Sequence, residues 1–204
     1  MTESAGSRSR SRGADLPAGA FTLTDAERAG VSRSRLYRLA SRGDLERVAP
    51  GVYRRADHEP MYDVELLGAA IRAPQATICL TSALVLHGLT DEIPAATDLA
   101  IPRGARPPEA SMAIRWHHWD EATFDIGRLD HVIAGTADLI GLYSAERTIV
   151  DAFRARNVAG YETANEALRR WLRRRGSHPV DLLAIADRLP RARGPIREAL
   201  QYLT

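Results

Sequence analysis

The sequence predicts an α+β protein in which a winged helix-turn-helix precedes a mixed α/β domain with a C-terminal helical bundle. Within residues 21–55, two short helical segments bounded by glycines lead directly into a glycine-containing hairpin. Farther along, short apolar strand-like runs alternate with helical patterns, and after residue 144 only helical patterns follow. We therefore expect a disordered basic arm at 1–20, a winged helix-turn-helix at 21–56, and an α/β domain at 60–204 with its helices at about 145–203.

Positive charge is concentrated at the N-terminus. All 28 basic residues are arginine, and the formal net charge of the chain is +2. Residues 1–55 hold 11 Arg against 6 acidic residues, a net of +5, so the remainder has a net charge of −3. A basic module joined to a mildly acidic body is typical of polyanion-binding proteins. The arm at 1–20 is rich in Ser, Arg, Gly and Ala; a solvated tail is favoured there over a segment that contacts phosphates.

The helix-turn-helix is predicted from capping residues. The Thr-Asp-Ala-Glu sequence that starts at Thr24 is a capping box for a first helix, which Gly30 ends. Ser32 then caps a second helix that runs to about Arg42 and stops at Gly43. The tight turn between the helices sets them at a steep angle and leaves the second free to enter a major groove.

Polar residues on the second helix and in the hairpin are the expected DNA contacts. Leu36, Leu39 and Ala40 share one face at helical spacing, so the arginines lie on the other. Arginine forms bidentate hydrogen bonds with guanine, while serines and arginines near a helix end also bind phosphates. The predicted contacts are Ser32, Arg33, Ser34, Arg35, Tyr37, Arg38 and Arg42 from the helix, with Arg47, Arg54 and Arg55 from the hairpin.

A plain solvated face is the alternative interpretation of these arginines, and it would be favoured if the helix stood alone. The combination of a tight turn, a basic helix and a basic hairpin is more specific and favours DNA binding. On the second helix, we expect Arg33, Ser34, Arg35 and Arg38 to read bases. The remaining arginines would bind phosphates.

The rest of the chain reads as mixed α/β. An amphipathic helix is predicted at about 61–71, and Ile78–Leu80 is predicted to begin a strand before a short helix at Ala83–His87, capped by Thr81 or Ser82. Further strands are expected at Thr97–Ile101, Met112–His117 and within 124–143, and helices at about 145–156, 161–175, 179–189 and 195–203.

No catalytic or metal site is predicted. His117 and His118 are adjacent in a strand, so their side chains point to opposite faces and are poorly placed to bind one ion. His87 is expected to be a capping or core histidine, and Cys79 a small buried apolar residue. Gly176-Ser177 lacks the closely paired carboxylates of a nucleotidyltransferase, and no acidic cluster suggests a nuclease. We therefore expect neither an enzyme nor a cofactor.

Two further basic segments leave alternatives open. The stretch from Arg169 to Arg175 is predicted to be a solvated amphipathic face, with a second DNA contact or an acidic partner as the alternative. Arg103 and Arg106 in a proline-rich loop have the same ambiguity. No apolar run reaches the length of a membrane span, and no secretory signal precedes the domain. With a single cysteine as well, the sequence indicates the cytoplasm.

The stretch FTLTDAERAGVSRSRLYRLASRGDLERVAPGVYRRAD resembles the N-terminal winged helix-turn-helix of AbiEi-type antitoxins. The resemblance lies in the Gly-Val-Ser turn at 30–32, the Arg-Gly-Asp-Leu sequence at 42–45 and the Gly-Val-Tyr sequence at 51–53. It continues in ICLTSALVLHGL at 78–89, LAIPRGARPP at 99–108 and SAERTIVDAF at 144–153. Family members usually have a clear helix before the first capping box. Here that stretch contains Gly13, Pro17 and Gly19, so we expect this helix to be short or missing.

This resemblance implies an antitoxin of a type IV toxin–antitoxin system. Such a protein is expected to bind inverted repeats in double-stranded DNA of its own promoter, to repress its operon and to counteract a nucleotidyltransferase-like toxin. A second copy is a possible neighbour on the DNA. The alternative is a protein-interaction module that neutralises a partner enzyme by direct binding, with DNA binding secondary.

Overall fold

The computed structural model describes residues 16–17, 19–56, 63–108, 113–155 and 160–203. Its contacts divide the chain into two compact units, Met1–Arg72 with Ala134–Asp138, and Ala73–Ile133 with Leu139–Thr204. Both units combine helices with a β-sheet, which confirms the predicted α+β class. Most of the arm predicted to be disordered at 1–20 lies outside the described residues.

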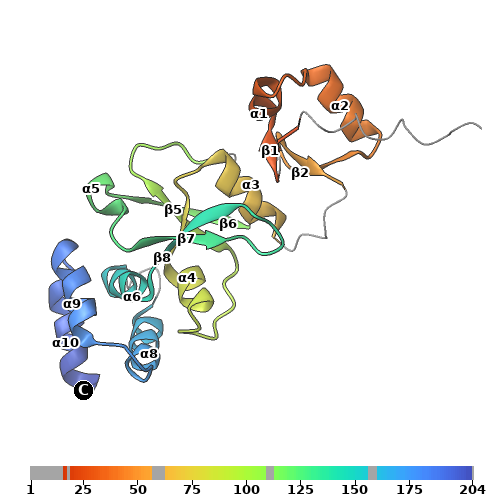
Figure 1. Cartoon of the computed structure of the whole chain (residues 1–204). Helices are drawn as coiled ribbons and strands as arrows, with labels where there is room; N and C mark the ends of the chain where they lie inside the picture. The colour runs from red at the N-terminus through yellow and green to blue at the C-terminus, as the bar shows by residue number, and fades with distance from the viewer. Residues whose placement is uncertain (1–15, 18, 57–62, 109–112, 156–159, 204) are drawn as a thin grey trace, which may run out of the picture. The chain divides into compact units, whose positions relative to one another are not determined.

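The first unit is a helix-turn-helix joined to a three-stranded antiparallel sheet of order β1-β3-β2 (Figure 1). The hairpin predicted from the sequence is formed by β2 and β3. Its elements are β1 (Phe21–Thr22), α1 (Leu23–Arg28), α2 (Arg33–Ser41), β2 (Leu45–Ala49), β3 (Val52–Arg55) and α3 (Val64–Arg72).

A small apolar core fixes the angle between α1 and α2. Ala26 of α1 and Leu36 of α2 are fully buried in it, together with Phe21 of β1. Between the helices, Gly30 has a φ of +80° and the Val31 amide donates to the Ala26 carbonyl at 2.8 Å. A side chain at Gly30 would strain this conformation, so the glycine allows the tight turn that was predicted.

Two features of the first unit differ from the sequence-based expectation. The N-cap of α1 is Thr22 rather than Thr24, because the capping box forms between Thr22 and Asp25 and the helix starts two residues earlier. The helix α3 belongs to the first unit, although the sequence placed it in the 60–204 domain. A Cβ at Gly68 of α3 would lie 2.6 Å from the Cβ of Ala49, so the absent side chain permits this close packing on β2.

The second unit contains a mixed five-stranded sheet of order β6-β5-β4-β8-β7. Strands β5 and β6 pair in parallel, as do β4 and β8, while β4–β5 and β7–β8 are antiparallel. Its elements are β4 (Thr77–Ile78), α4 (Leu80–Leu86), β5 (Thr97–Pro102), β6 (Ile114–Trp119), α5 (Glu121–Phe124), β7 (Arg128–Val132), β8 (Leu139–Tyr143), α6 (Ala145–Arg154), α8 (Tyr161–Leu172), α9 (Pro179–Arg188) and α10 (Arg193–Leu203).

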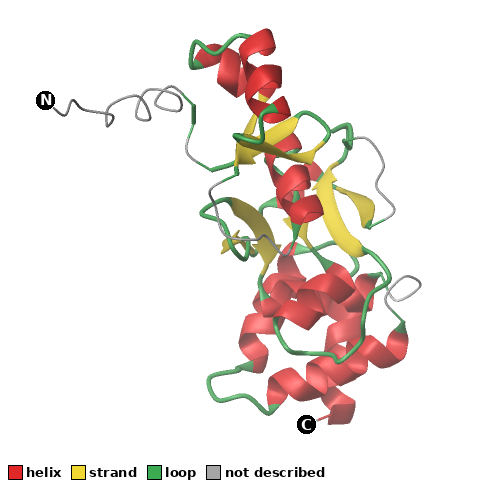
Figure 2. Ribbon diagram, turned by 90° about the vertical axis from the view of Figure 1, so that its right-hand side faces the viewer, coloured by secondary structure: helices red, strands yellow, loops and turns green. Residues whose placement is uncertain are grey.

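The C-terminal helices pack together, as predicted for a helical bundle (Figure 2). Helix α6 contacts α8, α9 and α10. Leu84 of α4, Phe153 of α6 and Trp171 of α8 share a large apolar core with described residues of α9 and α10. A smaller cluster against the sheet contains Cys79 and Tyr143, both fully buried. Among the described residues, no helix has the length and apolarity to cross a membrane.

Two local features of the second unit differ from the sequence-based expectation. Helix α4 is capped at Cys79 rather than Thr81 or Ser82, and the Ser82 hydroxyl instead accepts a hydrogen bond from the Asp98 amide at 2.9 Å. The short helix α5, capped by Asp120, was not predicted. A four-residue helix contains too little apolar periodicity to be recognised from sequence.

Candidate nucleic-acid interface and a buried arginine network

The polar face of α2 points away from the core of the first unit. The Ser32 hydroxyl caps the helix by accepting the Arg35 amide at 3.4 Å. Arg33, Ser34 and Arg38 are exposed, while Leu36 on the opposite face has no exposed surface. An α-helix with one face held by a core and the other in solvent has the geometry that insertion into a major groove requires.

The predicted base-reading side chains lie together on this face. Arg33, Ser34 and Arg38 come from the first two turns of α2, and Tyr37 beside them is 50% exposed. Arg35 is half-buried and makes further contacts. No acidic group is ion-paired with Arg33 or Arg38 within the described part of the chain, so both guanidinium groups remain available for a ligand.

The flanking arginines are distributed over α2 and the hairpin. Arg42, at the C-cap of α2, and Arg47, on β2, are exposed, and Arg55, at the end of β3, is half-buried. These positions are consistent with phosphate contacts on either side of a bound helix. Their role in DNA binding remains a prediction.

Arg54 differs from the other hairpin arginines. Its side chain is 8% exposed, and its Nη2 and Nε atoms lie 2.8 and 2.9 Å from Oε2 of Glu46. Burial and the ion pair across β2–β3 hold this guanidinium inside the unit, so the prediction that it contacts phosphate is corrected to a structural role. Sheet alternation gave only a weak signal for this: Arg54 shares a face with the fully buried Val52, but Tyr53 between them is buried as well.

The adjacent histidines of β6 are in different environments. The His117 Nε2 lies 2.8 Å from Oδ1 of Asp98, a carboxylate that is only 2% exposed and also faces Arg115. His118 is exposed on the other side of the strand. Among the described residues, no group of His, Cys, Asp and Glu side chains is arranged to bind a metal ion.

The arginines around α8 are partly engaged in contacts within the second unit. Arg170 forms ion pairs with Asp91 at 2.5 Å and Glu166 at 2.6 Å. Arg174 donates to the main-chain carbonyls of His87 and Gly88. These contacts give part of the stretch from Arg169 to Arg175 a structural role, whereas Arg169, Arg173 and Arg175 remain exposed.

A buried arginine network lies at the junction of α6 and the sheet of the second unit. Arg147 of α6 has no exposed surface, and its Nε donates to Oδ2 of Asp151 one turn later at 2.5 Å. Its Nη1 donates to the carbonyls of Thr123 at 2.8 Å and Ile126 at 2.6 Å. The guanidinium also lies over the ring of Tyr143, with Cζ 4.4 Å from the ring centroid.

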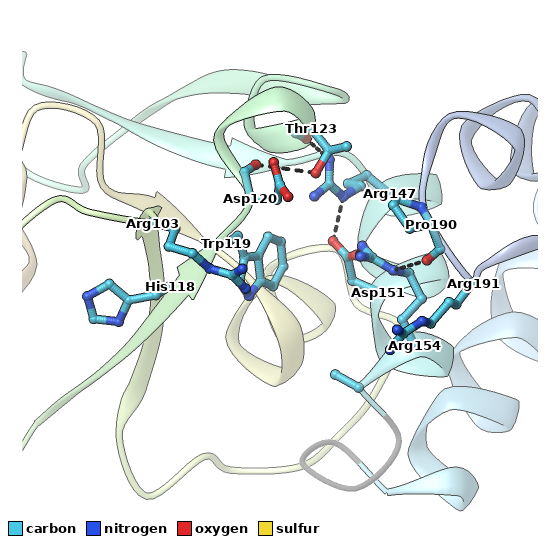
Figure 3. Close-up of a pocket in the computed structure, with 11 residues that line it drawn as sticks. Arg103, His118, Trp119, Asp120, Thr123, Arg147, Asp151, Arg154, Pro190 and Arg191 are labelled. Atoms are coloured by element: carbon cyan, nitrogen blue, oxygen red, sulfur yellow. Dashed lines mark hydrogen bonds and ion pairs between the residues drawn. The ribbon is translucent and has the colours of Figure 1, made fainter.

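Asp151 is the shared counter-ion of this network. Arg154 donates to its Oδ1 at 2.6 Å, so two arginines bind one carboxylate that is 3% exposed (Figure 3). Burial raises the pKa of Asp151, and the two guanidinium groups oppose that shift by favouring the carboxylate. Arg147 and Asp151 both belong to the motif SAERTIVDAF, to which the sequence analysis assigns no role. Their i, i+4 spacing on a helix is the one sequence signal for this ion pair.

The segment that contains the candidate interface is similar to a known protein family. Residues 17–56 match the family model described as transcriptional regulator, AbiEi antitoxin. We call residues 17–56 the AbiEi-type segment because of this similarity, which covers only that part of the chain. The AbiEi-type segment contains α1, α2 and the β2–β3 hairpin, so the match covers the whole candidate interface and confirms the predicted resemblance over that range.

Outside this segment, the chain has little similarity to known proteins. No curated protein sequence matches significantly. A solved structure, the RV2827C protein from Mycobacterium tuberculosis, is similar with 18% sequence identity and a TM-score of 0.46 over 92% of this chain and 77% of that one.

Proposed function

We propose that the chain is an antitoxin and DNA-binding repressor of its own operon, and that α2 is its recognition helix. The observation that carries the proposal is the exposed arginine face of α2 within the AbiEi-type segment. The protein acts by binding and has no catalytic activity of its own. Its target is an inverted repeat in its promoter, and it counteracts a nucleotidyltransferase-like toxin encoded beside it.

Base readout is assigned to Arg33, Ser34, Arg35 and Arg38. A bidentate contact between an arginine and guanine contributes about 1–3 kcal/mol of discrimination against the wrong base. Arg42, Arg47 and Arg55 supply affinity through phosphates, and this part falls with added salt because binding releases counterions.

Binding of the full chain to its own promoter region tests the proposal, with a scrambled duplex of equal length as the nonspecific competitor. Arg38→Ala should weaken promoter binding by about 1–3 kcal/mol and reduce nonspecific binding much less. Arg38→Lys retains the charge but loses the planar fork, so it should lose the same preference. Arg197→Ala, which removes an exposed arginine of α10 to which no DNA contact is assigned, is the matched control.

Equal loss on both duplexes would remove Arg38 from base readout, and wild-type protein that does not prefer its promoter would end the repressor proposal. A separate co-expression experiment tests the antitoxin role: the neighbouring nucleotidyltransferase-like protein should arrest growth, and this chain should restore it. Stable co-purification of the two proteins, without promoter binding, would favour direct neutralisation of the toxin instead.

A further inference from the structure

A cavity of about 500 Å3 lies beside the arginine network and is formed entirely by residues of the second unit. Its size is in the range typical of small-molecule sites. Figure 3 shows Arg103 and Trp119 on one side of it, with Arg154 and Arg191 on the other. Nothing in the DNA-binding function proposed for α2 uses this cavity.

Its lining carries an excess of positive charge. Four arginines and two aspartates line it, which gives a formal charge of +2 if the one lining histidine is neutral. Both oxygens of Asp151 are occupied by Arg147 and Arg154. Arg103 and Arg191 are exposed, and within the described residues neither is paired with a carboxylate. Two guanidinium groups therefore face the cavity without a counter-ion.

Arg147 supplies an independent indication that an acceptor is missing. It has no exposed surface, and its Nε and Nη1 are both hydrogen-bonded, but its Nη2 is buried without an acceptor in the described part of the chain. A buried donor without a partner is costly and uncommon in native proteins. Because Arg147 lines the cavity, an anion bound there could complete its hydrogen bonds with little movement.

The backbone at Arg191 supports the same conclusion. Arg191 has a φ of +62°, a conformation that costs free energy for any residue with a Cβ. The preceding carbonyl, of Pro190, accepts a hydrogen bond from the Arg154 Nε at 3.0 Å, which fixes this turn against the network. The chain thus holds an arginine at the rim of the cavity in a conformation that glycine would adopt more readily.

We propose that this cavity binds a phosphate monoester, with Arg103 and Arg191 as the contacting cations and Arg147 as the buried donor behind them. A phosphate monoester carries a charge near −2 and three acceptor oxygens, which match the excess charge and the several donors of the site. A carboxylate has half that charge and fewer acceptors. The phosphate can belong to a free nucleotide or to the 5′ end of a nucleic acid strand, since both present the same group.

Isothermal titration calorimetry of the full chain at constant ionic strength tests this, with AMP, adenosine, inorganic phosphate and acetate as probes. AMP and phosphate should bind, whereas adenosine and acetate should not. Arg103→Ala and Arg191→Gly should each weaken AMP binding about tenfold, the effect of one lost charge-assisted hydrogen bond. Arg191→Gly is the more informative variant, because it removes the cation without adding backbone strain.

Arg173→Ala, which removes an exposed arginine away from the cavity, should leave AMP binding unchanged. Equal binding of AMP and adenosine, or of phosphate and acetate, would overturn the proposal. So would unchanged AMP affinity in both cavity variants, because binding would then belong to other surface arginines. Promoter binding by these variants is a separate readout, so failure here is distinguishable from failure of the repressor function.

The source of the phosphate is resolved by trinucleotides with and without a 5′-phosphate. Stronger binding of the 5′-phosphorylated strand than of AMP would identify a nucleic acid end, and the reverse would identify a free nucleotide. Either result supports the site, provided that the 5′-hydroxyl strand binds more weakly than its phosphorylated form. Equal binding of the two strands would show that the terminal phosphate is not recognised and would contradict the proposal.

Discussion

Arg54 and Glu46 face each other across the β2–β3 hairpin, with the arginine Nη2 2.8 Å from the carboxylate Oε2. The arginines of this hairpin therefore differ in their roles. Arg54 is buried and holds the sheet together, whereas Arg47, one residue beyond Glu46, is exposed. Positive charge on this hairpin therefore serves both folding and the proposed binding of DNA.

Arg54→Ala should destabilise the first unit, because it leaves the Glu46 carboxylate without its partner and removes a packed side chain. We expect a loss of about 1–3 kcal/mol, as for other charged groups that lose a hydrogen-bond partner. Arg47→Ala should leave stability nearly unchanged and reduce the salt dependence of DNA binding by about one counterion. Amide hydrogen exchange of the hairpin and salt titrations of DNA affinity measure the two effects. A stable Arg54→Ala variant with weakened DNA binding would reverse these roles.

The first unit should lose stability at acid pH as Asp25 becomes protonated. The hydroxyl of Thr22 donates to its Oδ2 at 2.6 Å and lowers the pKa of this carboxyl below its ordinary value of 3.8. A lowered pKa in the folded state means that the stabilisation is present above pH 3.8 and is lost as the pH falls through the folded value. The protection of the α1 amides from exchange, relative to the intrinsic exchange rate at each pH, should therefore fall in that window.

Thr22→Ala isolates the cap. It should cost about 1 kcal/mol and remove this pH dependence, whereas Thr22→Ser, which retains the hydroxyl, should preserve both stability and pH response. Because Asp25 is partly exposed, solvent screens its interactions and we expect the pH effect to be modest. A Thr22→Ala protein with the wild-type pH profile would show that another carboxyl is responsible.

Asp151 should be essential for the stability of the second unit. Asp151→Asn removes the counter-ion of two arginines, one of them without exposed surface, and should destabilise the unit by about 3–5 kcal/mol. Asp187→Asn is the matched control: its pair with Arg193 is exposed, so the loss should be at most about 1 kcal/mol. Chemical denaturation followed by tryptophan fluorescence compares them, since Trp119 and Trp171 lie in this unit. Similar losses in both variants would contradict the structural role of the network.

Gly127 should tolerate no side chain. It has a φ of +70°, and an added Cβ would lie 2.8 Å from the Cβ of Arg147. Gly127→Ala should therefore lower the unfolding midpoint of the second unit, at a cost of about 1–3 kcal/mol from the backbone conformation alone. Gly104→Ala is the control, because its φ is also positive but no atom lies within 4 Å of the added Cβ. If both substitutions cost the same, the contact with Arg147 contributes nothing.

The sequence predicted α2 well and the burial of Arg54 poorly, for different physical reasons. Helix α2 is defined by local features: Ser32 at its N-cap and Leu36 and Leu39 at helical spacing. Arg54 is buried because β3 is the central strand of its sheet, with Val52 and Tyr53 covered on opposite faces. The pairing of β1 with β3 creates that central position, and a two-residue strand gives almost no sequence signal.

The cavity was not predictable for a related reason. Arg103 follows β5, Arg147 belongs to α6 and Arg191 follows α9, so the fold alone brings these three together. From the sequence, Arg103 is a loop cation with two alternative roles, a solvated side chain or a binding contact. The partner of each charge depends on tertiary contacts, and sequence spacing showed only the one-turn pair of Arg147 with Asp151.

Cys79 makes the protein convenient to study one half at a time. It is the single cysteine of the chain, it has no exposed surface, and burial raises the pKa of its thiol. A thiol-specific dye should therefore react only when the second unit opens, and its labelling rate reports the opening equilibrium of that unit. Substitutions on α2 can then be screened for silent damage to the other half of the molecule without any engineered probe.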